Sequence, residues 1–342
     1  MYRNMAIEFA LLNKDTFDEQ CYIHSIVFGD EDGQVETYWQ KKHYDNPLGN
    51  SLIFGVYIDE KLIGTECFQP YSYKCNNQEL RILNSTDSGI LPEYQGKGIW
   101  GKLVRFAEEY IRNNTDYDML IGFPNYRNSY YGYQKMKWET VFILNNYLLV
   151  NNPMSFLQTI LPNRKGLQHI LSVFFSIQKF FIKCLESKEL IVESISNELL
   201  IWNKVDKEFS IWFSDEQLVW KLDYKQLFCL GVKDKNDNLL ATCIYGISKY
   251  KGQRIICINR LEFSSNNNTS EKIVLATLSS YLSKKYSDTA FIRVWVKPKD
   301  RYNKLFKSLF FLKTKHPNPF IVKNVSGKNM NYGWNVSFLD LD

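Results

Sequence analysis

The sequence predicts a mixed α/β protein made of two tandem domains, each a mixed, mostly antiparallel sheet flanked by helices. Two observations lead to this prediction. Apolar runs that alternate with a period of two are interspersed with runs of helical period, and the second half of the chain repeats the order of the first. A chain of 342 residues is also long enough for two well-buried cores. We expect domains at residues 1–150 and 191–342, joined by a linker at 151–190.

The first domain is predicted to open with a helix at residues 16–27 and the aromatic stretch TYWQKKHYDNPLGN. Two alternating strands then form a hairpin around the turn Asp59-Glu60-Lys61. A further strand at 79–88 leads into a glycine-rich turn and a second helix. The domain is completed by strand 119–123, helix 129–136 and strand 140–150.

Residues 165–186 of the linker carry an amphipathic helical pattern. Its apolar stripe includes Ile170, Phe174 and Phe181, and its polar residues include Gln178 and Lys183. A helix that joins two sheets must bury one face somewhere, and we therefore favour an inter-domain helix packed on the core. A membrane-surface helix or a dimerisation helix is the alternative, because basic amphipathic segments serve either purpose.

The third region resembles a decayed copy of the first. Both copies have a Trp, an aromatic spacer, a strand that ends in Gly-Val, an acidic turn and two more strands, and FIRVWVKPKDRYNKLFKSLFFL echoes LIGFPNYRNSYYGYQKMKW. Where the first copy has QGKGIWG, however, the second has SSNNNTSEKI, without glycine. We therefore expect the second domain to share the fold, to lack the glycine-rich site, and to help shape a pocket at the domain boundary.

The stretch LPEYQGKGIWGKLVRFAEEY, residues 91–110, has the properties of a phosphate-binding turn. Glycines let the backbone turn tightly and approach a ligand, and the helix that follows presents free N–H groups and its positive dipole end to an anion. The spacing fits neither the nucleotide P-loop nor the dinucleotide-binding pattern. The residues of this predicted cradle are Gln95, Gly96, Lys97, Gly98, Ile99, Trp100 and Gly101.

This turn resembles the acyl-CoA loop of the GNAT superfamily of N-acyltransferases, in which Gln or Arg is followed three residues later by Gly and two further on by Gly or Ala. Gln95 and Gly98 fit that pattern, while Trp100 replaces the second small residue. A second block, DMLIGFPNYRNSYYGYQKMKW, resembles the family's next strand and helix, with Asn125 and Tyr133 at its Asn and Tyr positions. The resemblance covers roughly residues 20–145.

The resemblance implies transfer of an acyl group from acyl-CoA to an amine. It implies that the backbone of Ser88, Gly89 and Ile90 binds the pantetheine arm, and N–H groups there could polarise the thioester. It makes Tyr133 the candidate general acid for the departing sulfur; the alternative is a core tyrosine. Asn125 is either a ligand of a pantetheine amide or a helix N-terminal cap.

The general base and the acceptor are less closely defined by the sequence. Asp87, just before the pantetheine-binding segment, could accept the ammonium proton directly or through water, or could be a salt-bridged structural residue. Among family relatives, two-domain chains with a similar W…DNP stretch often acylate amino sugars for surface polysaccharides, so the resemblance implies an amino-sugar acceptor, which is typically nucleotide-linked. The candidate acceptor-binding residues are Trp39, His43, Tyr44 and Tyr71, although aromatic residues at such positions also fill cores and a single histidine is often structural.

Composition sets further expectations. A net charge of +5 is too small and dispersed to indicate nucleic-acid binding. The seven cysteines include no C-x-x-C pair, so we expect neither a metal site nor a disulfide framework. Without a signal peptide or an apolar run long enough to span a bilayer, the chain is expected to be cytoplasmic, and the amphipathic linker and high aromatic content are compatible with a homodimer.

Two other functions stay open at this stage. A Fem-like aminoacyl transferase is also a tandem GNAT-like protein, but that class lacks the acyl-CoA loop and carries a long two-helix arm. A non-catalytic acyl-CoA-binding or scaffold protein would bind CoA without turning over an amine, and Tyr133→Phe would not affect it.

Overall fold

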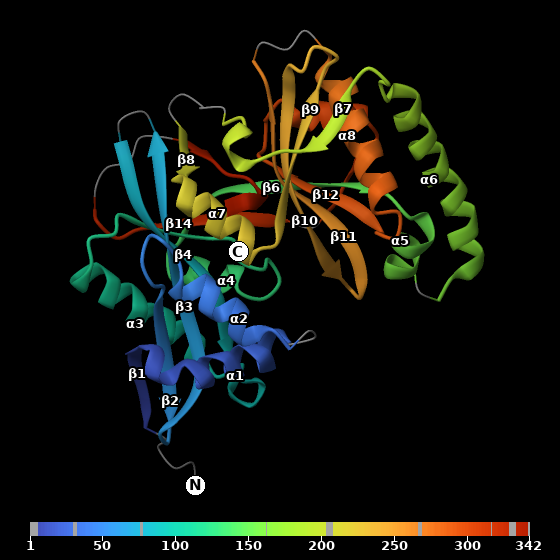
Figure 1. Ribbon diagram of the computed structural model, residues 1–342. Coiled ribbons are helices and arrows are strands. Elements are labelled where there is room, and N and C mark those ends of the chain that lie inside the picture. The colour runs from blue at the N-terminus through green and yellow to red at the C-terminus, as the bar shows by residue number, and fades with distance from the viewer. Residues whose placement is uncertain are drawn as a thin grey trace.

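The structure is a computed structural model that describes residues 6–29, 33–75, 78–161, 163–202, 208–265, 269–315, 317–327 and 333–340. Its strands form one continuous sheet in the order β1-β2-β3-β4-β5-β14-β6-β12-β11-β10-β9-β7. Among the described strands, three pairs are parallel, namely β4–β5, β11–β12 and β8–β15, where β15 is Gly333–Asn335, and the rest are antiparallel. Figure 1 shows the two halves of the sheet side by side, each flanked by helices. The predicted mixed α/β fold is confirmed.

The first half of the chain follows the predicted order closely. Its predicted hairpin is present, because Asp59 and Glu60 both have positive φ (50° and 66°), as a two-residue type I′ turn requires. Strand β1, helix α2 and the π-helical segment η2 (Gln40–Tyr44) were not predicted. The strands and α-helices of this half are β1 (Ile7–Leu12), α1 (Phe17–Phe28), α2 (Val35–Trp39), β2 (Leu52–Ile58), β3 (Lys61–Cys75), β4 (Gln78–Ile90), α3 (Ile99–Asn114), β5 (Met119–Gly122) and α4 (Tyr130–Lys135).

The second half repeats this order, as the sequence similarity between the halves led us to expect. Helix α7 begins with a capping box in which the side chains of Ser214 and Gln217 satisfy each other's backbone N–H groups. Of the glycine-free stretch 264–273, residues 266–268 lie outside the described part of the chain. The elements are β7 (Ile191–Ser194), β8 (Glu208–Trp212), α7 (Asp215–Tyr224), β9 (Leu227–Lys233), β10 (Leu239–Tyr250), β11 (Gln253–Phe263), α8 (Glu271–Lys285), β12 (Phe291–Val296) and α9 (Tyr302–Ser308).

The two halves exchange strands at the centre of the sheet. Strand β6 (Glu139–Val150) leaves the first half and pairs with β12, from Phe291↔Val150 to Val296↔Asn145. Strand β14 (Asn318–Asn324) leaves the second half and pairs with β5. The two exchanged strands also pair with each other. Each half of the sheet thus contains a strand from the other half of the chain. The halves of the sheet therefore do not coincide with the predicted division of the chain at residues 150 and 191.

The linker contains α5 (Pro153–Ile160) and α6 (Lys165–Leu185), which lie against the second half at the outer edge of the molecule (Figure 1). The predicted inter-domain helix therefore packs on the core with one face: Ile182 belongs to the core of the second half, and Phe175 packs on Phe156 of α5. In the described part of the chain, no helix has the length and apolar character needed to span a bilayer.

Candidate active site

A cavity of about 940 Å³ opens where the parallel strands β4 and β5 diverge. The two strands pair from Ile82↔Met119 to Ser85↔Gly122, where β5 ends. Strand β4 continues to Ile90, and its edge on that side faces the cavity. The remaining walls are the start of α3, the loop before α4 and the end of α1. A sheet edge that is open in this way can pair with the amides of an extended ligand.

The glycine-rich turn forms one end of the cavity. Gly98 is the N-cap of α3, and both Gly96 and Gly98 are in the left-handed region with φ of 74° and 73°. A Cβ at either glycine would meet nothing within 4 Å, so the backbone there is open to a ligand. Gln95 fixes the turn, since its side-chain amide donates to the Ile90 carbonyl at 2.7 Å.

The predicted cradle residues line the cavity with one exception. Gln95, Gly96, Gly98, Ile99, Trp100 and Gly101 are in its wall. Lys97 is not, because its ammonium donates to the Glu93 carbonyl at 2.8 Å and lies over the Tyr94 ring. In this structure the Lys97 side chain therefore contacts the turn from outside the cavity, and its predicted role in ligand binding stays a prediction.

Trp100, which replaces a small residue of the family pattern, fills the space beneath α4. A Cβ at Gly132 would overlap with its ring, and its ring lies edge-on to Tyr133 with centroids 5.0 Å apart. The indole N–H donates to Ser88 Oγ at 2.6 Å and to Glu66 Oε2 at 3.1 Å. The bulky side chain is thus accommodated by a glycine and held by hydrogen bonds.

Glu66 is the functional candidate that the sequence analysis missed. Its carboxylate is fully buried behind the cavity wall and accepts hydrogen bonds from Ser85 Oγ (2.8 Å), Ser88 Oγ and the Trp100 indole. Burial raises the pKa of Glu66 to about 7, even though these hydrogen bonds act to lower it. A glutamate inside the apolar strand LIGTECF was the available signal, because a buried carboxylate there must have partners.

Tyr133 lines the cavity and touches this glutamate. Its hydroxyl lies 2.6 Å from Ser85 Oγ and 3.4 Å from Glu66 Oε1. Burial first, and the nearby Glu66 carboxylate second, raise the pKa of Tyr133 well above its usual value. The phenol therefore keeps its proton at neutral pH. Tyr133 is also part of the core of the first half, as one of the two interpretations made from the sequence expects, and its role as general acid stays a prediction.

Asp87 sits in a β-bulge directly across from Glu66. The register of β3 and β4 shifts between Thr65↔Gly89 and Cys67↔Thr86, so that Asp87 and Ser88 together face one residue of β3. Asp87 has a φ of 45°, which is uncommon for a residue with a side chain. The bulge directs Ser88 Oγ toward Glu66 and the Asp87 carboxylate toward α1 and η2.

Three cationic or potentially cationic side chains surround the Asp87 carboxylate. Lys42 Nζ lies 2.6 Å and His43 Nε2 3.0 Å from Oδ2, while His24 Nε2 lies 3.6 Å from Oδ1. Lys42 and His43 are fully buried, and Asp87 is 12% exposed at the cavity. Burial alone would raise the pKa of Asp87, but the Lys42 charge and the hydrogen bonds from both histidines outweigh it and hold the pKa well below its usual range.

The structure does not bring the predicted acceptor-binding residues to the cavity. Trp39 is fully buried and donates its indole N–H to Gln20 Oε1, which also accepts from the Tyr44 hydroxyl. Tyr71 is buried against the Lys221 ammonium. His43 is fully buried, and its ring nitrogens lie within hydrogen-bond distance of Ser51 Oγ and Asp87 Oδ2. These predictions are corrected: the aromatic residues fill a core that supports η2, and His43 helps to hold the Asp87 carboxylate.

Asn125 lines the cavity but its side-chain oxygen is already used. Oδ1 accepts from the Arg127 N–H at 2.9 Å, and the Asn125 carbonyl accepts from the N–H groups of Asn128, Ser129 and Tyr130. The residue therefore organises the turn before α4 rather than capping the helix itself, whose N-cap is Ser129. Its side-chain NH₂ group is the part that can serve a ligand.

The equivalent place in the second half is nearly closed. It lies at the second parallel pair, β11 and β12, and its cavity measures only about 60 Å³. Phe306 of α9 and the C-terminal residues 335–337 occupy its wall. Of these two related places, only the one in the first half leaves room for a large ligand.

Comparisons with known proteins agree with this geometry. Residues 8–141 match the family described as Acetyltransferase (GNAT) domain. None of the curated proteins gives a significant match. A GCN5-related N-acetyltransferase from Anabaena variabilis aligns with 94% of this chain and 73% of its own, with a TM-score of 0.59 and 13% identity.

Two further solved structures cover the chain similarly. A putative acetyltransferase from Pyrococcus horikoshii aligns over 100% of this chain and 98% of its own, with a TM-score of 0.55 and 12% identity. Saccharomyces cerevisiae N-myristoyltransferase, solved with bound myristoyl-CoA, aligns over 93% and 79%, with a TM-score of 0.59 and 12% identity. At such identities these likenesses show the fold alone.

The fold and the cavity at diverging strands define the class of the first half. Over residues 8–141, fewer than half of the 342 in the chain, the sequence matches the acetyltransferase (GNAT) domain family. The predicted enzyme class, an acyl-CoA-dependent N-acyltransferase, is thereby confirmed, whereas the acceptor is not identified by these comparisons.

Proposed function

We propose that this protein transfers an acyl group from acyl-CoA to the amine of a nucleotide-linked amino sugar, such as a dTDP- or UDP-amino sugar, by direct attack of the amine on the thioester. The observation that carries the proposal is the cavity between β4 and β5, which joins an anion-binding helix start to an unpaired strand edge and a buried tyrosine. These three parts match the pyrophosphate, the pantetheine arm and the thioester of one donor.

The donor would bind along the cavity in a fixed direction. The N–H groups at the start of α3, around Gly98, would hold the pyrophosphate. The edge of β4 at 88–90 would pair with the pantetheine amides, with the side-chain NH₂ group of Asn125 available from the opposite wall. The thioester would then lie near Tyr133, where the two strands separate.

Asp87 would receive the acceptor amine. Because its pKa is held low, the carboxylate stays ionised and attracts the ammonium group to the cavity wall. It would also stabilise the positive charge that develops on the attacking nitrogen. Since a carboxylate of low pKa holds a proton only briefly, that proton would pass on to water at the open side of the cavity.

Tyr133 would protonate the departing sulfur. Glu66 would control the direction of the phenol proton through Ser85. When Glu66 is ionised, Ser85 donates to it and the phenol proton is directed at Ser85. When Glu66 is protonated, it can donate to Ser85, Ser85 can donate to the Tyr133 oxygen, and the phenol proton is free for the thiolate. Tyr133 would then be reprotonated along the same path, and Glu66 would regain its proton from water.

The walls around Asp87 support a sugar acceptor. Near the divergence of the strands they carry hydroxyl and amide side chains rather than an extended apolar surface. A group of this composition can exchange hydrogen bonds with sugar hydroxyls. The residues are Asn84, Ser85, Thr86, Ser88, Asn128 and Ser129.

Calorimetric titration with acetyl-CoA tests the donor site. Gly98→Trp should abolish binding, because its side chain would occupy the cradle. Gly252→Trp is the matched control: Gly252 also has positive φ (75°) and open surroundings, but it lies in the turn between β10 and β11. Wild-type binding that survives in Gly98→Trp would place the CoA elsewhere.

The acceptor is tested by release of free CoA thiol in the presence of dTDP- and UDP-linked amino sugars. Turnover of at least one of them, dependent on Tyr133, is the expected result. If acetyl-CoA binds but no amine turns over, the protein is a CoA-binding scaffold. If acetyl-CoA does not bind at concentrations well above ~100 µM, aminoacyl transfer becomes the better explanation.

A further inference from the structure

Helix α6 presents a long apolar surface to the outside of the molecule. Its exposed large side chains are Ile170 (70% exposed), Val173 (63%), Phe174 (61%), Ile177 (50%), Phe180 (63%) and Phe181 (47%). The exposed thiol of Cys184 continues the series. We call these seven residues the α6 face. Phe310, itself 49% exposed, extends the face, since its ring centroid lies 5.4 Å from that of Phe181.

The α6 face is not the side by which the helix is attached to the protein. The attached side carries Phe175 and Ile182, which are buried. On that side Gln178 donates to the Phe310 carbonyl, and Lys179 Nζ donates to the Asn151 carbonyl at 2.9 Å. The fold therefore accounts for one side of α6 and gives no reason for apolar residues on the other.

The α6 face is large for a monomer. Taking roughly 200 Å² for a phenylalanine side chain, its three phenylalanines alone expose about 340 Å². With the three aliphatic residues the patch exceeds the ~300–600 Å² of the largest patch on an ordinary monomer. It approaches the ~800 Å² that each partner buries in a standard protein–protein interface.

The spacing of the face is that of a helix-pairing seam. Ile170, Val173, Ile177, Phe180 and Cys184 follow one another at intervals of three, four, three and four residues. This is the alternation of the a and d positions of a heptad, which places a narrow apolar stripe against a partner helix. Phe174 and Phe181 broaden the stripe at the following position of each heptad.

We propose that the α6 face binds the same face of a second copy of this chain and forms a two-fold dimer through paired α6 helices. A two-fold axis lets one patch serve both partners, and no residue of the face carries a charge that would repel its counterpart. The proposal does not depend on the proposed acyl transfer, because α6 packs on the second half of the protein.

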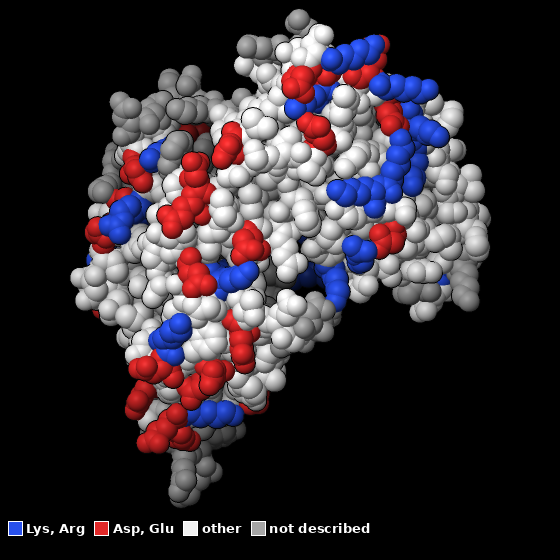
Figure 2. Space-filling view, viewed as in Figure 1, with Lys and Arg blue, Asp and Glu red and all other residues white. Residues whose placement is uncertain are grey.

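The composition of α6 favours a protein partner over a lipid surface. Interfacial membrane helices have a polar face rich in Lys and Arg, and Trp or Tyr residues mark the membrane boundary. The polar strip beside the α6 face consists of His169, Ser172, Ser176 and Lys183, and the helix contains neither Trp nor Tyr. Figure 2 likewise shows few charged side chains at the outer edge where α6 lies.

Light scattering coupled to size-exclusion chromatography of the full chain tests the proposal. The wild type is expected at twice the chain mass of 40.4 kDa, and Ile177→Glu at the monomer mass. Ser176→Glu is the matched control, because it adds the same charge one residue away on the polar strip and should leave the dimer intact. Phe180→Glu, at a more exposed position, repeats the test independently, and circular dichroism checks that each variant is folded.

Either of two results would overturn the proposal. One is a wild type that stays monomeric up to chain concentrations on the order of 100 µM, a weak affinity for a dimer. The other is a dimer that persists in both folded glutamate variants, which would place the interface elsewhere. Co-sedimentation with phosphatidylcholine–phosphatidylglycerol vesicles is measured in parallel, and binding by a monomeric wild type that is lost in Ile177→Glu would assign the face to lipid instead.

Discussion

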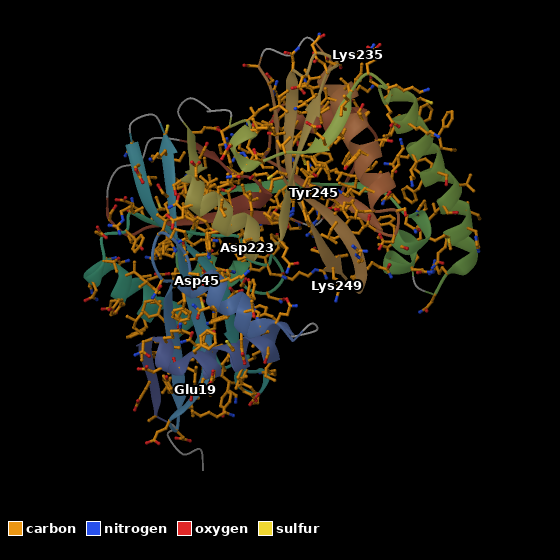
Figure 3. The ribbon with its side chains drawn as sticks, in the orientation of Figure 1. Glu19, Asp45, Asp223, Lys235, Tyr245 and Lys249 are labelled. Carbon is orange, nitrogen blue, oxygen red and sulfur yellow. The ribbon has the colours of Figure 1, made fainter. Side chains whose placement is uncertain are left out.

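Trp220 donates its indole N–H to the backbone carbonyl of Lys41 at 2.7 Å, and the two residues belong to different halves of the protein. Trp220 is on α7, and Lys41 is in η2, next to the Lys42 and His43 that hold Asp87. Lys41 Nζ also pairs with Asp223 of α7 at 2.6 Å; Figure 3 labels Asp223 and also Asp45, the residue that follows η2. The second half thus supports the candidate site without lining its cavity.

Trp220→Phe is expected to weaken this support. The change removes the N–H and leaves the Lys41 carbonyl without that donor, which should cost about 1 kcal/mol and lower the turnover rate more than the affinity for acetyl-CoA. Thermal unfolding and steady-state kinetics measure the two effects. Val219→Ala, on the exposed side of the same helix (54% exposed), should change neither. Equal kinetics in wild type and Trp220→Phe would show that α7 is only a structural element.

Tyr133→Phe is expected to lower kcat by about 100-fold or more, since it removes the proposed general acid, while acetyl-CoA binding changes little. Steady-state kinetics and calorimetry separate the two quantities. The control is Tyr131→Phe, because Tyr131 is exposed and hydrogen-bonds only to the Tyr126 hydroxyl among the described contacts. An unchanged kcat in Tyr133→Phe would exclude the phenol from the reaction.

The pH dependence of turnover should report Glu66. If its protonated form frees the Tyr133 proton, kcat falls as the pH rises through about 7, the pKa to which burial raises this carboxyl group. Glu66→Gln cannot ionise, so its profile should lack this step. The measurement is kcat against pH from 5.5 to 9 at saturating substrates, a range that brackets that pKa. A step near 7 that persists in Glu66→Gln would have to come from another group.

Glu66 should also make stability depend on pH. Its folded-state pKa of about 7 lies above the ordinary glutamate value of 4.5, so the folded protein favours the protonated form. This contribution is fully present below pH 4.5 and is lost as the pH rises through 7. At 1.36 kcal/mol per pKa unit the loss is about 3 kcal/mol. Chemical unfolding of wild type and Glu66→Gln at pH 5 and pH 8 measures it: the variant should gain relative stability at the higher pH.

Lys42→Met is expected to destabilise the fold by about 3 kcal/mol, because it leaves the Asp87 carboxylate without its buried cation. The low pKa of Asp87 stabilises the wild type above the unfolded-state pKa, and this contribution is lost as the pH falls through the folded-state pKa. The gap between wild type and variant should therefore narrow in acid. Lys41→Met, which breaks only an exposed pair, should cost less than ~1 kcal/mol.

Much of the first half was predictable because its signals are local. The Asp59-Glu60 turn, the alternation of the flanking strands and the glycines before α3 each act over a few residues, and the structure places these elements as expected. The cradle residues lie in consecutive order along the chain, so a pattern in the sequence was sufficient to find most of the cavity wall. The direction of the Lys97 side chain was not predictable, because it depends on where Glu93 and Tyr94 lie.

The rest depends on contacts between residues far apart in the chain. Glu66 and Tyr133 meet only after β3 and α4 have packed together, and Lys42 reaches Asp87 only because η2 lies over the bulge in β4. Aromatic residues that bind a ligand and aromatic residues that fill a core look the same in a sequence. The sequence therefore could not show that Trp39 and Tyr71 are core residues. The sequence by itself determined the fold class, the repeat and the anion-binding turn, since these follow from local period and backbone freedom. The tertiary structure decided the exchanged strands, the buried carboxylate network and the exposed α6 face, because burial is a property of the packed chain.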